Sequence, residues 1–146
     1  MRTFLLCLLM ATPTIVHAQE APAASAHTVT HAADAQVQVA PSGKAKVVLL
    51  AQGKNAFLGR LELAPGAKVP LHRDATEEYI HFLAGGGTIT VDGQAHAVKA
   101  GSTIYMPANA EVTFTNGDAP AVAIQVFAGP APAAKYQKWK AVAAKK

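Results

Sequence analysis

The chain has 146 residues, of which 51% are hydrophobic and 15% are charged. This composition excludes an intrinsically disordered protein, and the length is that of one domain. The single cysteine, Cys7, excludes an internal disulfide and a site built from several thiolates. Five of the thirteen Lys and Arg residues lie between Lys135 and Lys146, so the positive charge belongs to the C-terminal tail. We therefore expect no nucleic-acid partner.

The first eighteen residues have the pattern of a secretory signal peptide. Arg2 provides the positive start, a short apolar run follows over residues 4–10, and Val16-His17-Ala18 provides small residues before a cleavage point. The run is shorter than the roughly 20 residues of a membrane-spanning helix. We expect cleavage near Ala18, a secreted or periplasmic protein, and no stable membrane anchor.

The mature chain begins with an Ala-rich leader over residues 19–35, which we expect to be flexible. Short β-rich segments follow in close succession, and Gly or Pro residues separate them. The predicted strands cover residues 36–39, 46–50, 57–63, 78–83, 88–91, 103–106, 111–115 and 121–127. This pattern predicts an all-β antiparallel sandwich or barrel over residues 36–130.

The C-terminal segment, residues 131–146, is predicted to be a Lys-rich tail with a helix over residues 133–144. Tyr136 and Trp139 are three residues apart, so both can pack one face of the helix against the barrel. We interpret the tail lysines as a solvated face.

One segment combines residues that can bind a metal. His72 and Asp74 are two residues apart, so an extended strand would place both on one face, and Glu78 can share that inward face. A buried carboxylate is costly unless it is paired or bound to a metal, and one nitrogen with two oxygens suits Mn, Fe or Zn. The alternative is that these are rim residues, with Asp74 capping a turn and both Glu77 and Glu78 partly solvated.

Residues 66–85 resemble the first sequence motif of the cupin superfamily. Gly66, His72, Glu78 and Gly85 have the spacing of that motif, and Asp74 stands where the family has its second His. The resemblance implies an antiparallel double-stranded β-helix, also called a jelly roll, to which the short helical tail predicted above is added.

Residues 101–116 resemble the second cupin motif. Gly101, Pro107 and Asn116 match, and Asn109 replaces a Gly, which Asn tolerates because it also accepts left-handed backbone. Val112 replaces the family's last metal-binding His. Cupins usually hold a metal with three His and one Glu, so the resemblance implies a site reduced to His72, Asp74 and Glu78.

Other polar residues have weaker signals. Arg60 and Gln125 lie in predicted strands among apolar neighbours, and either can face inward to bind a polar or anionic ligand. His81 alternates with Glu78 and is expected on the outer face, whereas the facing of His96 is not fixed by the sequence.

Three functions remain open at this point. The first is an exported cupin that binds a small molecule in its barrel, with a weakly held divalent metal (Mn, Fe, Ni or Zn). The second is a metal-dependent enzyme of the dioxygenase or isomerase kind that uses His72, Asp74 and Glu78. The third is a non-catalytic dimeric scaffold. We expect a homodimer because small cupins often pair, and because Tyr79, His81 and Leu83 form a semi-apolar outer face.

Overall fold

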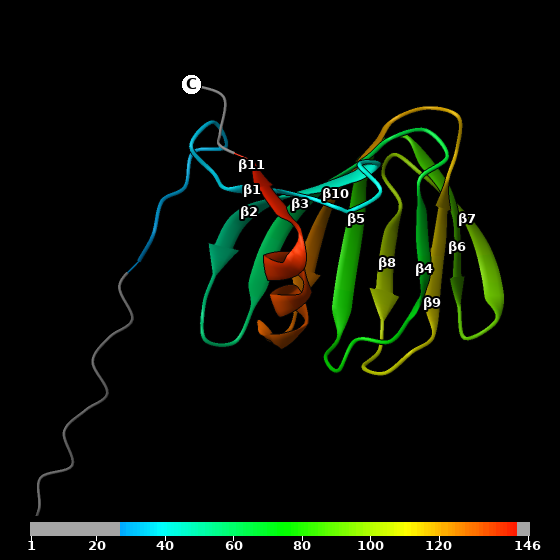
Figure 1. The fold of residues 1–146 in the computed structure, drawn as a ribbon. Helices are drawn as coiled ribbons and strands as arrows, with labels where there is room; N and C mark the ends of the chain where they lie inside the picture. The colour runs from blue at the N-terminus through cyan, green and yellow to red at the C-terminus, as the bar shows by residue number, and fades with distance from the viewer. Residues whose placement is uncertain (1–26, 143–146) are drawn as a thin grey trace, which may run out of the picture.

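The computed structural model describes residues 27–142, so the predicted signal peptide lies outside the described residues. Within them the chain forms two antiparallel sheets (Figure 1). The larger sheet contains, in spatial order, β11 (Lys140–Val142), β1 (Val37–Val39), β2 (Ala45–Gln52), β3 (Phe57–Leu63), β10 (Ala121–Phe127), β5 (Glu78–Ala84) and β8 (Thr103–Met106). The smaller sheet contains β4 (Lys68–His72), β9 (Val112–Asn116), β6 (Gly86–Val91) and β7 (Gln94–Lys99). The predicted antiparallel all-β fold is confirmed.

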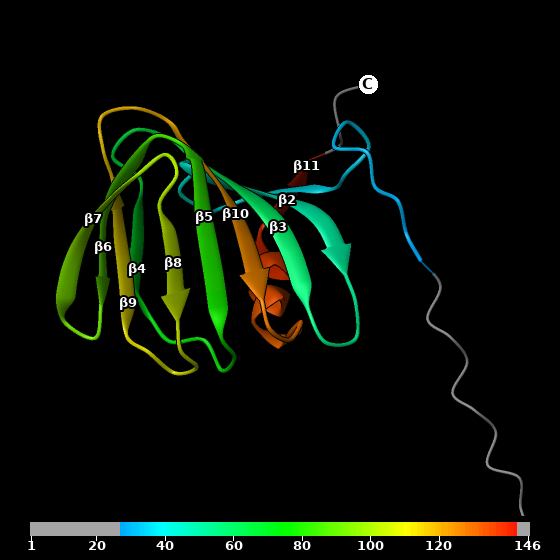
Figure 2. The ribbon, with the colours of Figure 1, turned by 180° about the vertical axis from the view of Figure 1, so that it is seen from behind.

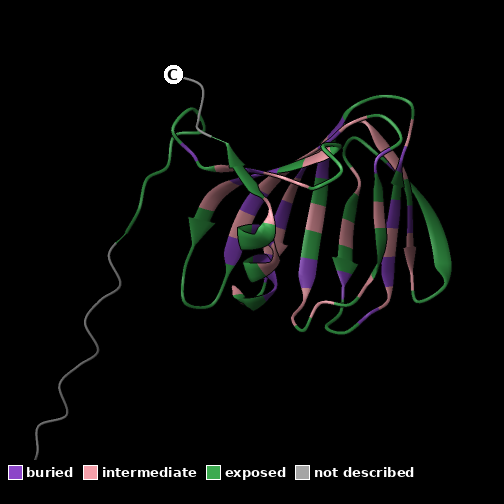
Figure 3. Ribbon diagram, viewed as in Figure 1, coloured by how far each residue is buried: buried purple, intermediate pink, exposed green. Residues whose placement is uncertain are grey.

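The main core lies between the two sheets. Along β10 every second residue is buried, which is the period of a strand with one face in the core (Figure 3). Large apolar side chains of both sheets meet there, among them Phe82 and Phe114, whose ring centroids are 5.6 Å apart. Two more buried members are Ile89 and Met106. Packing in this core fixes the positions of the strand ends, and the candidate site residues lie at those ends.

The C-terminal segment covers the part of the larger sheet that extends beyond the smaller one. It forms a 3₁₀ helix, η1 (Ala131–Lys138), which lies beside β3 and β10 (Figures 1 and 2). Tyr136 of η1 packs on Phe57, and Phe57 packs on Phe127, with ring centroids 5.9 Å apart in both pairs. A second hydrophobic cluster therefore ties the tail to the barrel.

A short helical tail is present as predicted, but its bounds differ from the predicted residues 133–144. Up to residue 142, where the described part ends, the segment is helical over Ala131–Lys138, Trp139 is extended, and β11 pairs with β1. A 3₁₀ helix has three residues per turn, so side chains at i and i+3 are aligned. The rings of Tyr136 and Trp139 accordingly lie edge to face at 4.9 Å. Packing of the aromatic pair is confirmed, although the helical geometry is tighter than expected.

The turns carry two backbone positions that the motifs singled out. Gly85 has φ +67°, and an added Cβ would lie 2.3 Å from the Pro120 carbonyl oxygen, so only Gly fits. Asn109 has φ +65°, which confirms the expected left-handed backbone at this position. Among residues 27–142 no helix reaches the length and apolarity of a membrane span.

Candidate functional site

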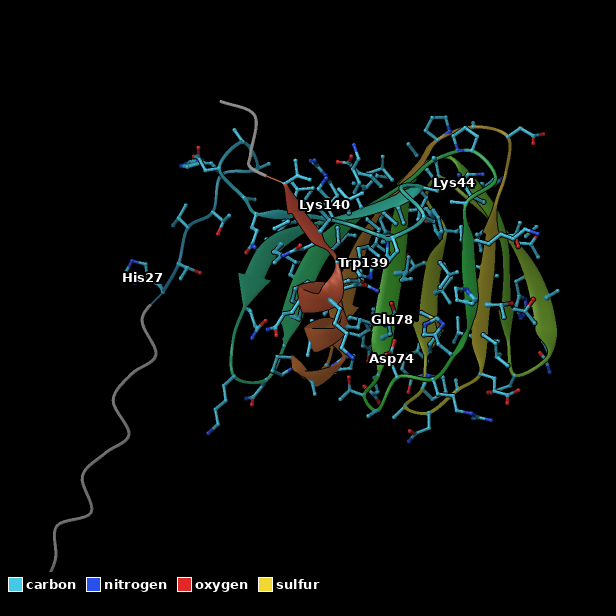
Figure 4. The ribbon with its side chains drawn as sticks, viewed as in Figure 1. His27, Lys44, Asp74, Glu78, Trp139 and Lys140 are labelled. Atoms are coloured by element: carbon cyan, nitrogen blue, oxygen red, sulfur yellow. The ribbon has the colours of Figure 1, made fainter. Side chains whose placement is uncertain are left out.

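The three candidate ligands converge at one end of the barrel. His72 is the last residue of β4, Asp74 lies in the loop that follows, and Glu78 is the first residue of β5. One potential ligand atom from each residue lies within 4.8 Å of the others. Figure 4 shows Asp74 and Glu78 close together on the side of the barrel next to η1. The fold therefore brings together the three residues that the spacing predicts as ligands.

The route to this convergence differs in part from the expected one. Because β4 ends at His72, Asp74 does not share a strand face with it. The loop instead returns toward the second motif, where the Asn109 N–H donates a hydrogen bond to the Asp74 carbonyl oxygen at 2.7 Å. Asp74 Oδ2 thereby lies 3.6 Å from His72 Nε2. The left-handed turn at Asn109 thus holds the loop that carries the middle ligand.

The orientation of the His72 ring is fixed by its own strand. Its Nδ1 lies 3.0 Å from the Pro70 carbonyl oxygen, which suits Nδ1–H as the donor. This tautomer leaves a lone pair on Nε2, the nitrogen that faces Asp74. Val112 of β9 is the register partner of His72 and is buried. It contributes no ligand atom, so the described site has one imidazole.

Glu78 is the most deeply buried of the three, with 4% of its surface exposed. Desolvation raises the pKa of its carboxyl group, more than the opposing effects of the Gln125 hydrogen bond and the Lys135 charge lower it. Gln125 Nε2 donates to Glu78 Oε1, and the Tyr136 hydroxyl donates to Gln125 Oε1 at 2.7 Å. This chain of hydrogen bonds holds the buried carboxylate in place.

Lys135 of η1 is a member of the site that the sequence analysis missed. Its Nζ donates to both carboxylate oxygens of Asp74, at 2.8 Å and 3.0 Å. The same Nζ lies 4.9 Å from the centroid of the Phe127 ring and 5.7 Å from that of Tyr136. The interpretation of the tail lysines as a solvated face is wrong for Lys135. The docking pair Tyr136 and Trp139 was the signal that could have placed this lysine against the barrel.

The remaining candidate residues have different positions. Gln125 faces the interior and contacts Glu78, whereas Arg60 lies on the other face of its strand and pairs with Glu62 at 2.7 Å. The structure therefore brings Gln125 to the cluster but not Arg60. His81 is exposed and lies 2.8 Å from the Thr103 hydroxyl, as its outward phase predicted.

His96 lies away from the cluster, on β7. It lines a separate cavity of about 410 Å³ between β7 and β8, together with Ile89 and Ile104. Its imidazole is not grouped with the three candidate ligands, so it does not replace the missing fourth one.

The donor set fits a divalent transition metal. One imidazole nitrogen and two carboxylates are ligands that Mn, Fe or Zn accept, and three protein ligands leave positions open for a small molecule. An ammonium group already pairs with Asp74, so the cluster is attractive to a cation. The raised pKa of Glu78 shows that this buried carboxyl group lacks full compensation for its charge. A metal bound there would supply it.

Comparison with known proteins agrees with this architecture. Residues 59–127 match the family model described as a cupin domain. An RmlC-like cupin from Shewanella frigidimarina superimposes with a TM-score of 0.65 and 14% identity, covering 71% of this chain and 92% of that one. A predicted oxalate decarboxylase from Thermotoga maritima gives a TM-score of 0.61 and 19% identity, covering 70% and 99% of the two chains. At these identities the likeness concerns the fold alone.

A curated relative is similar at the level of sequence. Dimethylsulfoniopropionate lyase DddW from Ruegeria pomeroyi is 36% identical over 58 residues, which cover 40% of this chain. The matched region spans 38% of that relative's length, so most of the relative has no counterpart in the comparison.

Proposed function

Because residues 59–127 form a cupin domain, we propose that this protein binds a divalent transition metal through His72, Asp74 and Glu78 and a small molecule beside it. The observation that carries the proposal is the approach of three ligand atoms to within 4.8 Å of one another. Mn, Fe, Ni and Zn are the metals that we expect this donor set to accept.

The surrounding residues prepare the site rather than ligate. Gln125 and Tyr136 orient the Glu78 carboxylate, and the Pro70 carbonyl orients the His72 ring. When bound, the metal would supply a Lewis acid that polarises an oxygen of the small molecule. Val112 leaves one side of the site without a ligand, which supports an open and weak site compared with that of four-ligand cupins.

Metal content and titration test this proposal. Protein purified from its native compartment is analysed for transition metals, and the metal-free protein is titrated calorimetrically with Mn²⁺, Fe²⁺, Ni²⁺ and Zn²⁺. His72→Ala and Glu78→Ala should abolish binding, whereas His96→Ala, a matched control at an exposed histidine outside the cluster, should not. Binding that persists in both ligand variants would refute the site.

A metal-dependent enzyme is the second candidate, and the sequence similarity to the lyase supports it. Dimethylsulfoniopropionate is the first substrate to assay with the metal-loaded protein, with His72→Ala as the control. Oxidation by O₂ and isomerisation of small molecules are the other reaction classes that a three-ligand site can support. A non-catalytic dimeric scaffold follows if metal and small molecules fail to bind.

We also propose that the protein is exported. The support is the signal-like pattern of residues 1–18, which precede the described part of the chain. Intact-mass measurement of the secreted fraction should give a chain that starts at Gln19. A secreted chain that retains Met1 would contradict this.

A further inference from the structure

We propose that Lys135 is a built-in competitor of the metal, because its ammonium group pairs with both carboxylate oxygens of Asp74 and a divalent cation must displace it. The inference rests on the proposed metal site and goes further. It makes the C-terminal segment, which lies beyond residues 59–127 of the cupin match, the element that sets the metal affinity.

The contact is specific in its geometry. Nζ of Lys135 reaches both oxygens of Asp74, and one of these oxygens is the ligand atom that Asp74 offers to a metal. The docking of η1 through Tyr136, which is 4% exposed, holds the lysine backbone beside the site. The ammonium group is therefore delivered by a packed element and does not reach the site from a free tail.

The charges of the site explain why the two cations exclude each other. Asp74 has 13% of its side chain exposed, and solvent screens charges weakly at such a depth. The other ionisable groups that face it are His72, at 3.6 Å, and Glu78. The two carboxylates balance a divalent cation when His72 is neutral, which leaves the charge of Lys135 in excess.

Displacement is physically accessible. The side chain of Lys135 is 36% exposed, and its four-carbon stem lets the ammonium group turn toward solvent while the backbone of η1 stays docked. The wild-type site should consequently bind metal more weakly than the same ligands would without the lysine. Metal binding should also loosen the contact between η1 and the loop that carries Asp74.

Substitution of Lys135 tests the competition. Lys135→Met keeps the length and removes the charge, Lys135→Gln is a second neutral variant, and Lys135→Arg keeps the charge. Lys138→Met is the matched control, because Lys138 lies on the same helix and is exposed. Calorimetric titration with Zn²⁺ should give a Kd at least tenfold lower for the two neutral variants than for wild type. Lys135→Arg and Lys138→Met should remain close to wild type.

A purely structural role of Lys135 predicts a different pattern. Loss of packing would lower both thermal stability and Zn²⁺ affinity, whereas competition predicts a lower unfolding midpoint of the metal-free neutral variants together with tighter Zn²⁺ binding. If wild type binds Zn²⁺ and the neutral variants bind it equally or more weakly, the competition is refuted while the metal site stands. If no variant binds Zn²⁺, the metal site and the competition both fail.

Discussion

Restoring an imidazole opposite His72 gives the sharpest test of the site geometry. Val112 is the register partner of His72 across the β4–β9 pair, and side chains of such partners have Cβ atoms roughly 4.5–5.5 Å apart. A Val112→His side chain would therefore project into the same end of the barrel. We expect it to add a fourth ligand and to lower the Kd for Zn²⁺ or Ni²⁺ at least tenfold, which is about 1.4 kcal/mol.

The same substitution should destabilise the metal-free protein. Val112 is 6% exposed, so its replacement forfeits about 1.5–3 kcal/mol of apolar burial, partly regained by the ring, and buries an imidazole that costs about 1–3 kcal/mol if unpaired. A net loss of about 2–4 kcal/mol is expected from these two effects. A metal concentration of about one hundred times Kd should restore about 2.7 kcal/mol of the lost stability, because the metal binds only the folded state.

Calorimetry and thermal unfolding with and without metal measure both effects. Val112→Phe is the matched control, because it introduces a ring at the same place but no ligand atom. It should lose stability without gaining affinity. A Val112→His variant that binds Zn²⁺ no more tightly than wild type would show that residue 112 does not face the ligands, and the inferred geometry would be wrong.

Three further outcomes are expected. Glu78→Gln should raise the unfolding temperature of the metal-free protein at pH 7. The pKa of this carboxyl group is raised in the folded state, so its ionisation costs stability as pH rises above the unfolded pKa of about 4.3. If Glu78→Gln still had the higher unfolding temperature at pH 3, where the carboxyl group is protonated in both states, ionisation would not be the cause. Tyr136→Phe removes the 2.7 Å hydrogen bond to Gln125, whose amide in turn orients the Glu78 carboxylate. The free energy of unfolding should fall by about 1 kcal/mol, and metal affinity should fall by roughly 10–100-fold. Unchanged affinity would show that this bond does not orient Glu78. The exposed rings of Tyr79 and Tyr105, 5.3 Å apart, lie on the face proposed for homodimerisation, so light scattering should give a dimer for wild type and a monomer for the double Ser variant.

The sequence predicts best the strands that alternate clearly and end at Gly or Pro, whether they are central, as β3 and β10 are, or at an edge, as β8 is. The predicted bounds of β3, β8 and β10 coincide with the observed ones, because alternation is clear there and Gly or Pro residues end the run. The two strands of the smaller sheet that were not predicted, β4 and β7, are its edges. An edge strand tolerates Pro70 and an exposed Ala-rich run around His96, since a partner and a packed face are missing on one side.

Some residues of the candidate site are predictable from their spacing in the sequence, and others meet only through tertiary contacts. His72, Asp74 and Glu78 lie within seven positions, so spacing alone suggests that they meet. The contact of Lys135 with Asp74 joins residues 61 positions apart. It depends on how η1 docks on the barrel, and the spacing of Tyr136 and Trp139 predicts that docking but not which acidic group the lysine meets. The 3₁₀ geometry, which aligns Tyr136 with Trp139, is a tertiary outcome of the same docking.

Asp74, Glu78 and the tail residue Lys135 form one electrostatic unit. The resemblance places a neutral imidazole at position 74, and Asp74 instead adds a negative charge next to the buried Glu78. Two close carboxylates without a counter-charge would oppose folding of the metal-free protein. Lys135 supplies that counter-charge from η1, at 2.8 Å from Asp74, and its charge lowers the pKa of Glu78 in opposition to desolvation. The tail thereby supplies a counter-charge to the two carboxylates, and metal binding at the proposed site would require this ion pair to open.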